Sequence, residues 1–132
     1  MELIEQQPTA TGPAEWFTGT VYINQLCAAE APARLRADLA RFTPAARTHW
    51  HQHGLGQTLH IVSGTALIGT RDGHIIEARS GDTVWMPPGE EHWHGATGDQ
   101  FMAHLAMWEG DDVTWNEAVT DTDYQRDRTP AR

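Results

Sequence analysis

The feature that most constrains this chain is a run of metal-binding residue types, His51, His53 and Gln57, followed much later by His92. Side chains at positions i and i+2 of a β-strand point to the same face, so His51 and His53 share one side of a sheet. Three imidazoles and one amide oxygen that converge on one point form a mononuclear metal site. Nitrogen and oxygen donors without a thiolate suit Mn(II), Fe(II), Zn(II), Ni(II) or Cu(II).

The amide at position 57 sets the charge of this predicted site. A glutamate there would offset one charge of a divalent ion, whereas the neutral Gln57 offsets none. An uncompensated ion polarises a bound oxygen more strongly and lowers the pKa of bound water further. The same charge makes electron loss from Fe(II) harder. The sequence therefore favours Lewis-acid or proton chemistry over oxygen activation.

The rest of the chain is typical of an all-β protein. Short apolar stretches alternate with turn signals, among them Asp72-Gly73, which fits a tight hairpin. Many short strands at this spacing predict one β-sandwich or barrel domain in a chain of 132 residues. We expect strands over residues 16–26, 35–42, 47–52, 57–62, 65–69, 75–78, 83–86, 91–94 and 101–107.

The two ends of the chain are expected to differ from this barrel, which we place at residues 16–112. Residues 1–15 contain Pro8, Gly12 and Pro13, and we expect an arm that pairs with a second subunit in a homodimer or higher homo-oligomer. Residues 113–132 are expected to hold one short helix, with Thr120 or Asp121 as its N-cap, and a frayed end beyond Asp127.

Composition excludes several classes of partner. Nine basic against eighteen acidic residues give a net charge of −9, which argues against binding to nucleic acids or anionic membranes. No apolar run approaches the roughly 20 residues of a membrane span, and the acidic N-terminus has no signal-peptide core. The single cysteine, Cys27, cannot form an internal disulfide, so we expect a cytoplasmic protein. We expect its partner to be a small-molecule substrate.

Further residues are candidates for the site because of their parity along expected strands. His104 is either a general base close to the metal or a hydrogen-bonded wall histidine. Asp38 shares a face with Ala40 and Phe42, so its carboxylate lies either in a pocket or at an exposed edge. His94 lies two residues beyond His92 and is placed just behind the ligands or inside the pocket.

The tryptophans are expected to support these residues. Trp50 and Trp93 have the opposite parity to the neighbouring histidines, so they should pack behind the ligand strands. Trp108 shares the parity of His104 and could line the mouth of the pocket.

Two sequence motifs carry a resemblance to a known family. The first reads Ala45-x5-His51-x-His53-x3-Gln57-x6-Gly64, and the second reads Gly81-x5-Pro87-x-Gly89-x2-His92. Both resemble the motifs of the cupin superfamily, and sixteen residues separate them. The resemblance implies a small jelly-roll barrel. This chain departs from the family pattern at Ala45, where glycine is usual, and at Gln57, where glutamate is usual.

Longer strings resemble the small bacterial monocupins that include the (R)-selective hydroxynitrile lyases. This resemblance implies Mn(II) held by His51, His53, Gln57 and His92, with His104 in proton transfer during cyanohydrin cleavage. Two pocket positions, Asp38 and Trp108, depart from that pattern, where a small apolar and a smaller polar residue are expected. An Fe(II) dioxygenase of a dicarbonyl or enol substrate and a non-catalytic small-molecule-binding cupin remain the alternatives. The strings that carry the resemblance are residues 12–21, 46–48, 55–59, 88–95, 104–106 and the tail segments 113–115 and 119–121.

Overall fold

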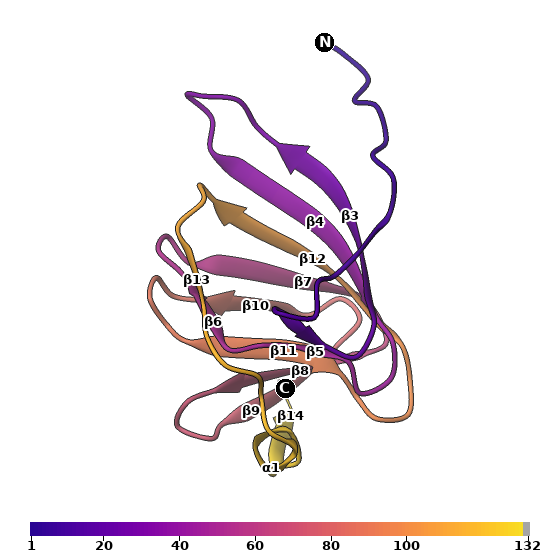
Figure 1. Cartoon of the computed structure of the whole chain (residues 1–132), viewed down its shortest axis with the longest axis vertical. Coiled ribbons are helices and arrows are strands. Elements are labelled where there is room, and N and C mark those ends of the chain that lie inside the picture. Colours follow the sequence, from indigo (N-terminus) through magenta and orange to yellow (C-terminus); the bar gives the residue numbers. More distant parts are fainter. Residues whose placement is uncertain (131–132) are drawn as a thin grey trace.

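Two β-sheets face each other across the interior of the molecule (Figure 1). The computed structural model describes residues 1–130. The first sheet has the order β1 (Ala10–Thr11), β3 (Val21–Ala28), β4 (Leu35–Phe42), β12 (Met102–Glu109), β7 (Gln57–Ser63) and β10 (Thr83–Met86). The second has the order β13 (Val113–Trp115), β6 (His51–His53), β11 (His92–Ala96), β8 (Thr65–Thr70), β9 (Ile75–Arg79) and β14 (Arg128–Pro130). Two short strands extend it, because β5 (Arg47–Thr48) pairs with β11 and β2 (Phe17–Thr18) pairs with β5.

The alternation of side chains along these strands builds two hydrophobic cores. The larger core fills the space between the sheets and includes Phe42, Leu59 and Ile61, all fully buried. The smaller core includes Leu67 and Trp93, whose neighbours along β8 and β11 point the other way. Strand β11 is consequently buried on both faces, and every residue in it is buried. The smaller core comprises Trp50, Leu67, Ile75, Trp93, Val119 and Tyr124.

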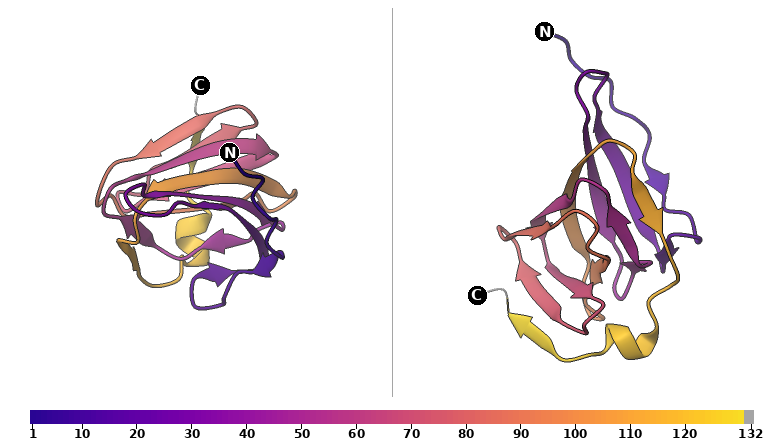
Figure 2. Two further views of the ribbon diagram at one scale, coloured as in Figure 1. Left: turned by 90° about the horizontal axis from the view of Figure 1, so that it is seen from above. Right: turned by 90° about the vertical axis from the view of Figure 1, so that its left-hand side faces the viewer.

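A short helix packs against the smaller core through Tyr124. Helix α1 (Asp121–Tyr124) lies at the end of the molecule opposite the N-terminus (Figure 2). The Thr120 hydroxyl accepts a hydrogen bond from the backbone N–H of Asp123 at 3.1 Å, which confirms Thr120 as the N-cap. The Tyr124 hydroxyl donates to the backbone oxygen of Ala96 at 2.7 Å and ties the helix to β11.

Two expected strands are divided in the structure. The stretch 16–26 turns at Gly19, which has a positive φ of 78°, and so forms β2 and β3. The stretch 47–52 breaks at His49 and Trp50, between β5 and β6. The backbone N–H groups of these two residues donate to Trp16 and Glu117 outside the sheet ladder, which explains the break.

Near both ends of the described chain, residues form strands that were not expected. Residues 113–115 form β13 beside β6, and Arg128–Pro130 pairs in parallel with β9, so the expectation of a frayed end is wrong for these three residues. Residues 131–132 lie outside the described part. In the arm, Ala10 pairs with Ile23 of the same chain. Pairing of the arm with a second copy stays a prediction.

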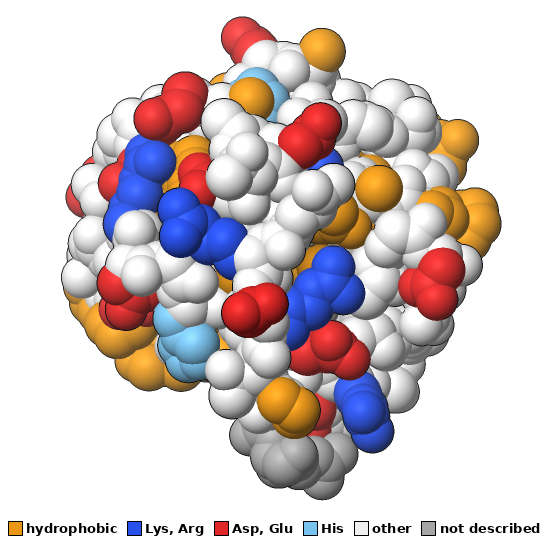
Figure 3. Space-filling model, turned by 90° about the horizontal axis from the view of Figure 1, so that it is seen from below, with side chains coloured by type: hydrophobic (Ala, Val, Ile, Leu, Met, Phe, Trp, Pro, Cys, Tyr) orange, Lys and Arg blue, Asp and Glu red, His pale blue; other side chains and the backbone are white. Residues whose placement is uncertain are grey.

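The outer surface carries charges of both signs. On the face near α1 and β14, acidic and basic side chains are interspersed (Figure 3). Across residues 1–130, no helix has the length and apolar character needed to cross a membrane.

The contact between Gly69 and Trp93 should be essential to the smaller core. A Cβ atom at position 69 would overlap the indole nitrogen of Trp93, which is buried. We expect Gly69→Ala to lower the free energy of unfolding by roughly 1–3 kcal/mol, the usual cost of overpacking. Gly98→Ala is the control, because its new methyl group would meet nothing within 4 Å. Urea unfolding measures both variants, and equal stability of the two would contradict the prediction.

Candidate metal centre

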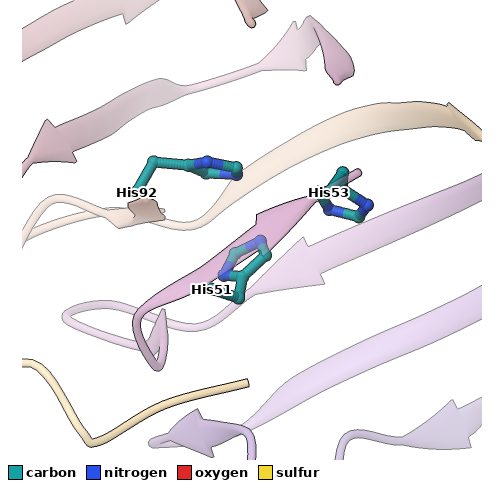
Figure 4. Close-up of side chains that lie close together, drawn as sticks. All are labelled: His51, His53 and His92. Carbon is teal, nitrogen blue, oxygen red and sulfur yellow. The ribbon is translucent and has the colours of Figure 1, made fainter. Parts of the chain in front are cut away.

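Three histidines gather where β6 and β11 pair. His51 and His53 lie on β6, and His92 lies on β11 directly opposite His51 in the strand register. Their rings turn toward a common space (Figure 4), and one ring nitrogen from each lies within 4.8 Å of the others. All three side chains are buried, with at most 5% of any of them exposed. The strand parity in the sequence predicts this meeting of His51 and His53.

Backbone carbonyl groups fix the tautomer of two of these rings. Nδ1 of His51 lies 2.9 Å from the backbone oxygen of His49, and Nδ1 of His92 lies 2.8 Å from that of Glu90. A carbonyl oxygen only accepts, so Nδ1 carries the proton in each ring and Nε2 keeps its lone pair. Metal-binding histidines are held in this way by the hydrogen bond of their second nitrogen.

His53 and Gln57 also have side-chain atoms in positions that suit binding of a metal ion. Both ring nitrogens of the buried His53 lack a hydrogen-bond partner within residues 1–130. Oε1 of Gln57 lies 3.0 Å from Nε2 of His92. Two lone pairs at this distance repel unless a cation lies between them or the amide turns its NH₂ group to the ring. The residues therefore fit a divalent ion held by three nitrogens and one amide oxygen.

Burial keeps these imidazoles neutral. Removal from water lowers the pKa of His92 to about 4, and removal from water together with the charge of His92 lowers the pKa of His53 to about 4. Burial also holds the pKa of His51 well below its usual value. Neutral imidazole is the form that binds metal ions, so the histidines are ready to act as ligands at neutral pH.

A cavity of about 440 Å³ opens onto this cluster. It lies between the sheets and is reached by side chains of β4, β6, β7, β11 and β12. Three of the four proposed ligands, all except His92, appear in its wall. The other predicted site residues in the wall are Asp38, Ala40, Phe42, His94, His104 and Trp108.

Two further histidines form a hydrogen-bonded pair in that wall. Nε2 of His104 lies 2.9 Å from Nδ1 of His94, and the second nitrogen of each ring is buried without a partner in residues 1–130. The ring of Phe42 packs against both, with centroids 5.1 Å from His104 and 6.0 Å from His94. Burial lowers the pKa of His104 to about 4 and that of His94 well below its usual value. Both rings are therefore neutral, and one can accept a proton while its neighbour shares the charge.

Sequence reasoning missed part of the aromatic wall. The ring of Trp115 stacks on His51 with centroids 4.4 Å apart, and Trp16 stacks on Trp115 at 5.1 Å. Trp115 belongs to a segment assigned to the tail after the barrel. The alternation of Val113 and Trp115, which both line the cavity, is the signal of a strand that could have revealed it.

Comparisons with known proteins agree with this geometry. A family model described as a cupin domain matches residues 38–109. The chain is 45% identical over 126 residues to a protein of Granulicella tundricola named (R)-mandelonitrile lyase, covering 93% of this chain and 96% of that one.

Solved structures show the same fold. A cupin-like protein from Thermotoga maritima superposes with a TM-score of 0.84 at 28% identity, covering 95% of this chain and 96% of its own. A cupin 2 conserved barrel domain protein from Rhodopseudomonas palustris gives a TM-score of 0.67 at 18% identity, over 87% of this chain and 77% of its own. The two-sheet architecture is thus the predicted jelly roll.

Loss of one proposed ligand should remove the metal and leave the fold. We expect His53→Ala to reduce bound metal to a small fraction of one ion per chain, because one of three imidazole donors is lost while both cores stay intact. The matched control is His74→Ala, an exposed histidine outside the cavity. Elemental analysis after growth in metal-supplemented medium measures both. Stoichiometric metal in His53→Ala would refute this assignment.

The buried imidazoles should make the metal-free protein sensitive to acid. An unfolded histidine takes up a proton near pH 6.5, whereas His53, His92 and His104 in the folded chain resist protonation down to about pH 4. The unfolded state therefore binds more protons in this window, so stability present above about pH 6.5 is lost as the pH falls toward 4. For His104 alone the loss approaches roughly 3 kcal/mol over the whole window. Urea midpoints of chelator-treated protein at about pH 7.5, 6 and 5 measure it, and equal midpoints would contradict it.

Proposed function

The chain belongs to the cupin family, and from that premise we propose that it is a metal-dependent hydroxynitrile lyase, which cleaves a cyanohydrin to an aldehyde and hydrogen cyanide. One observation carries the chemistry. The cavity that opens onto the three-histidine cluster also holds His104, a buried neutral imidazole able to accept a proton. Similarity to the protein named (R)-mandelonitrile lyase, over nearly the full length of both chains, supports a cyanohydrin as the substrate.

Four residues would hold the ion. We propose Mn(II) bound by His51, His53, Gln57 and His92, the ligand set that the family resemblance implies. When bound, a divalent ion supplies a Lewis acid that makes the hydroxyl group of a substrate more acidic. The neutral Gln57 leaves the charge of such an ion uncompensated, which strengthens this effect.

The His94–His104 pair would move the proton. With Nε2–H of His104 donating to Nδ1 of His94, the lone pair on Nδ1 of His104 is free to accept the hydroxyl proton. The electrons of the O–H bond form the aldehyde C=O bond, and those of the C–CN bond leave with cyanide. His104 then returns the proton to cyanide, giving hydrogen cyanide and the original imidazole. The reverse sequence adds cyanide to an aldehyde.

The aromatic wall suits an aryl substrate. Phe17, Phe42, Trp108 and Trp115 line the cavity beside the polar cluster. A flat apolar ring can pack against these side chains while the hydroxyl group faces the histidines. The same side chains exclude water from the proton transfer.

Replacement of the proposed base should abolish the reaction without affecting metal binding. We expect His104→Ala to retain full metal content and to lose roughly 10²–10⁴-fold in cyanohydrin cleavage, the usual contribution of a positioned acid–base group. Cyanide release from racemic mandelonitrile at mildly acidic pH measures turnover. The control is His60→Ala, a histidine on β7 that bonds to Thr83 outside the cavity.

Two results would overturn this assignment. Wild-type turnover in His104→Ala would make His104 a structural residue of the barrel wall. Oxygen uptake with a diketone, together with no cyanide release by the wild type, would favour the dioxygenase alternative.

A further inference from the structure

One acidic side chain in the cavity has no partner. Asp38 on β4 lines the cavity and is half-buried, and its carboxylate makes no hydrogen bond or ion pair within residues 1–130. The other acidic residue of the wall, Asp111, is an exposed rim residue paired with Arg36 at 3.3 Å. Among residues 1–130, no lysine or arginine lines the cavity. The charge of Asp38 is thus left for whatever enters the cavity.

The strand register places Asp38 close to the proposed chemistry. Its direct neighbour on β12 is Ala106, whose small side chain leaves room in front of the carboxylate. His104 and Trp108 lie two residues to either side of Ala106, so both are diagonal neighbours of Asp38. Such neighbours lie about 7–8 Å apart, within reach of one small ligand.

An aromatic side chain lies in the same part of the cavity wall. Trp108, diagonal to Asp38 in the strand register, packs near His53 with centroids 5.6 Å apart. The negative face of an indole ring attracts a cation, as a carboxylate does. Asp38 and Trp108 therefore form a surface on which a positive group is stabilised.

We infer that Asp38 is a specificity-determining residue, and that the cavity takes small substrates that carry a cationic nitrogen in addition to the hydroxyl group directed at the three-histidine cluster. This inference rests on the proposed function only in taking that cavity as the substrate site. Hydroxynitriles with an ammonium group are the class that it selects.

The partial burial of Asp38 supports the inference that it selects a cationic substrate. Burial raises the pKa of its carboxyl group, which means that the ionised form is disfavoured until a cation approaches. An uncharged aryl group supplies no such compensation. A cationic substrate turns an unfavourable buried charge into a binding contact.

Choline and 3,3-dimethylbutan-1-ol provide the test, because they have the same shape and hydroxyl group and differ in the positive charge. We expect the metal-loaded wild type to bind choline about tenfold more tightly in titration calorimetry, the size of a partly desolvated cation contact. Asp38→Asn should reduce this preference for choline to about twofold or less. Asp38→Glu, which keeps a carboxylate, should show the preference of the wild type. Asp127→Asn, which removes an exposed charge outside the cavity, should leave it unchanged.

Equal binding of the two probes by the wild type would overturn the inference, as would a preference that survives in Asp38→Asn. If Asp38→Asn does not fold, Asp38→Ser serves in its place. Binding requires no turnover, so the result is independent of cyanide release. A wild type that releases no cyanide but shows an Asp38-dependent preference for choline would refute the lyase and support the role of Asp38.

Discussion

The site depends on the pairing register between β6 and β11. His51 lies directly opposite His92, so the two strands bring two imidazoles together without any loop. A slip of one residue would turn the side chains of one strand to the opposite face of the sheet, where Trp93 packs in the smaller core, so the two imidazoles would no longer meet. The alternation of His92, Trp93 and His94 on β11 therefore stabilises one register, because only one places the Trp93 indole in the smaller core. Gln57 comes from the other sheet, so the full donor set also requires the two sheets to be packed together.

Burial determines the chemistry of the five histidines near the cavity. Isolated buried imidazoles cannot easily become charged, and an unpartnered buried polar group is costly. His51 and His92 offset this cost by hydrogen bonds to backbone carbonyl groups. His94 and His104 offset it by a hydrogen bond to each other. His53 has no partner in the described chain, which makes it the ring whose burial is hardest to explain without a bound cation.

Much of this arrangement could be predicted from the sequence, because period-two alternation decides which side of a strand a residue occupies. The shared face of His51 and His53, the burial of Trp50 and Trp93, and the positions of β4 and β10 follow from local pattern alone. The pattern could not predict pairings between distant segments. Strand β14 beside β9 depends on long-range backbone contacts, as does the break at His49. The stacking of Trp115 on His51 likewise requires the tail to return to β6.

The double burial of β11 has a consequence for how this protein can change. His92 joins the three-histidine cluster and His94 lines the cavity, from a strand whose other face is filled by Trp93, so a substitution there must satisfy two cores at once. Strand β4 and the C-terminal half of β12 carry no such double constraint, and they present Asp38, Ala40 and Trp108 to the same cavity. The residues of the candidate metal centre can thus be kept in evolution while the opposite wall of the cavity varies, so the shape of the cavity can change without a change in the proposed ligands.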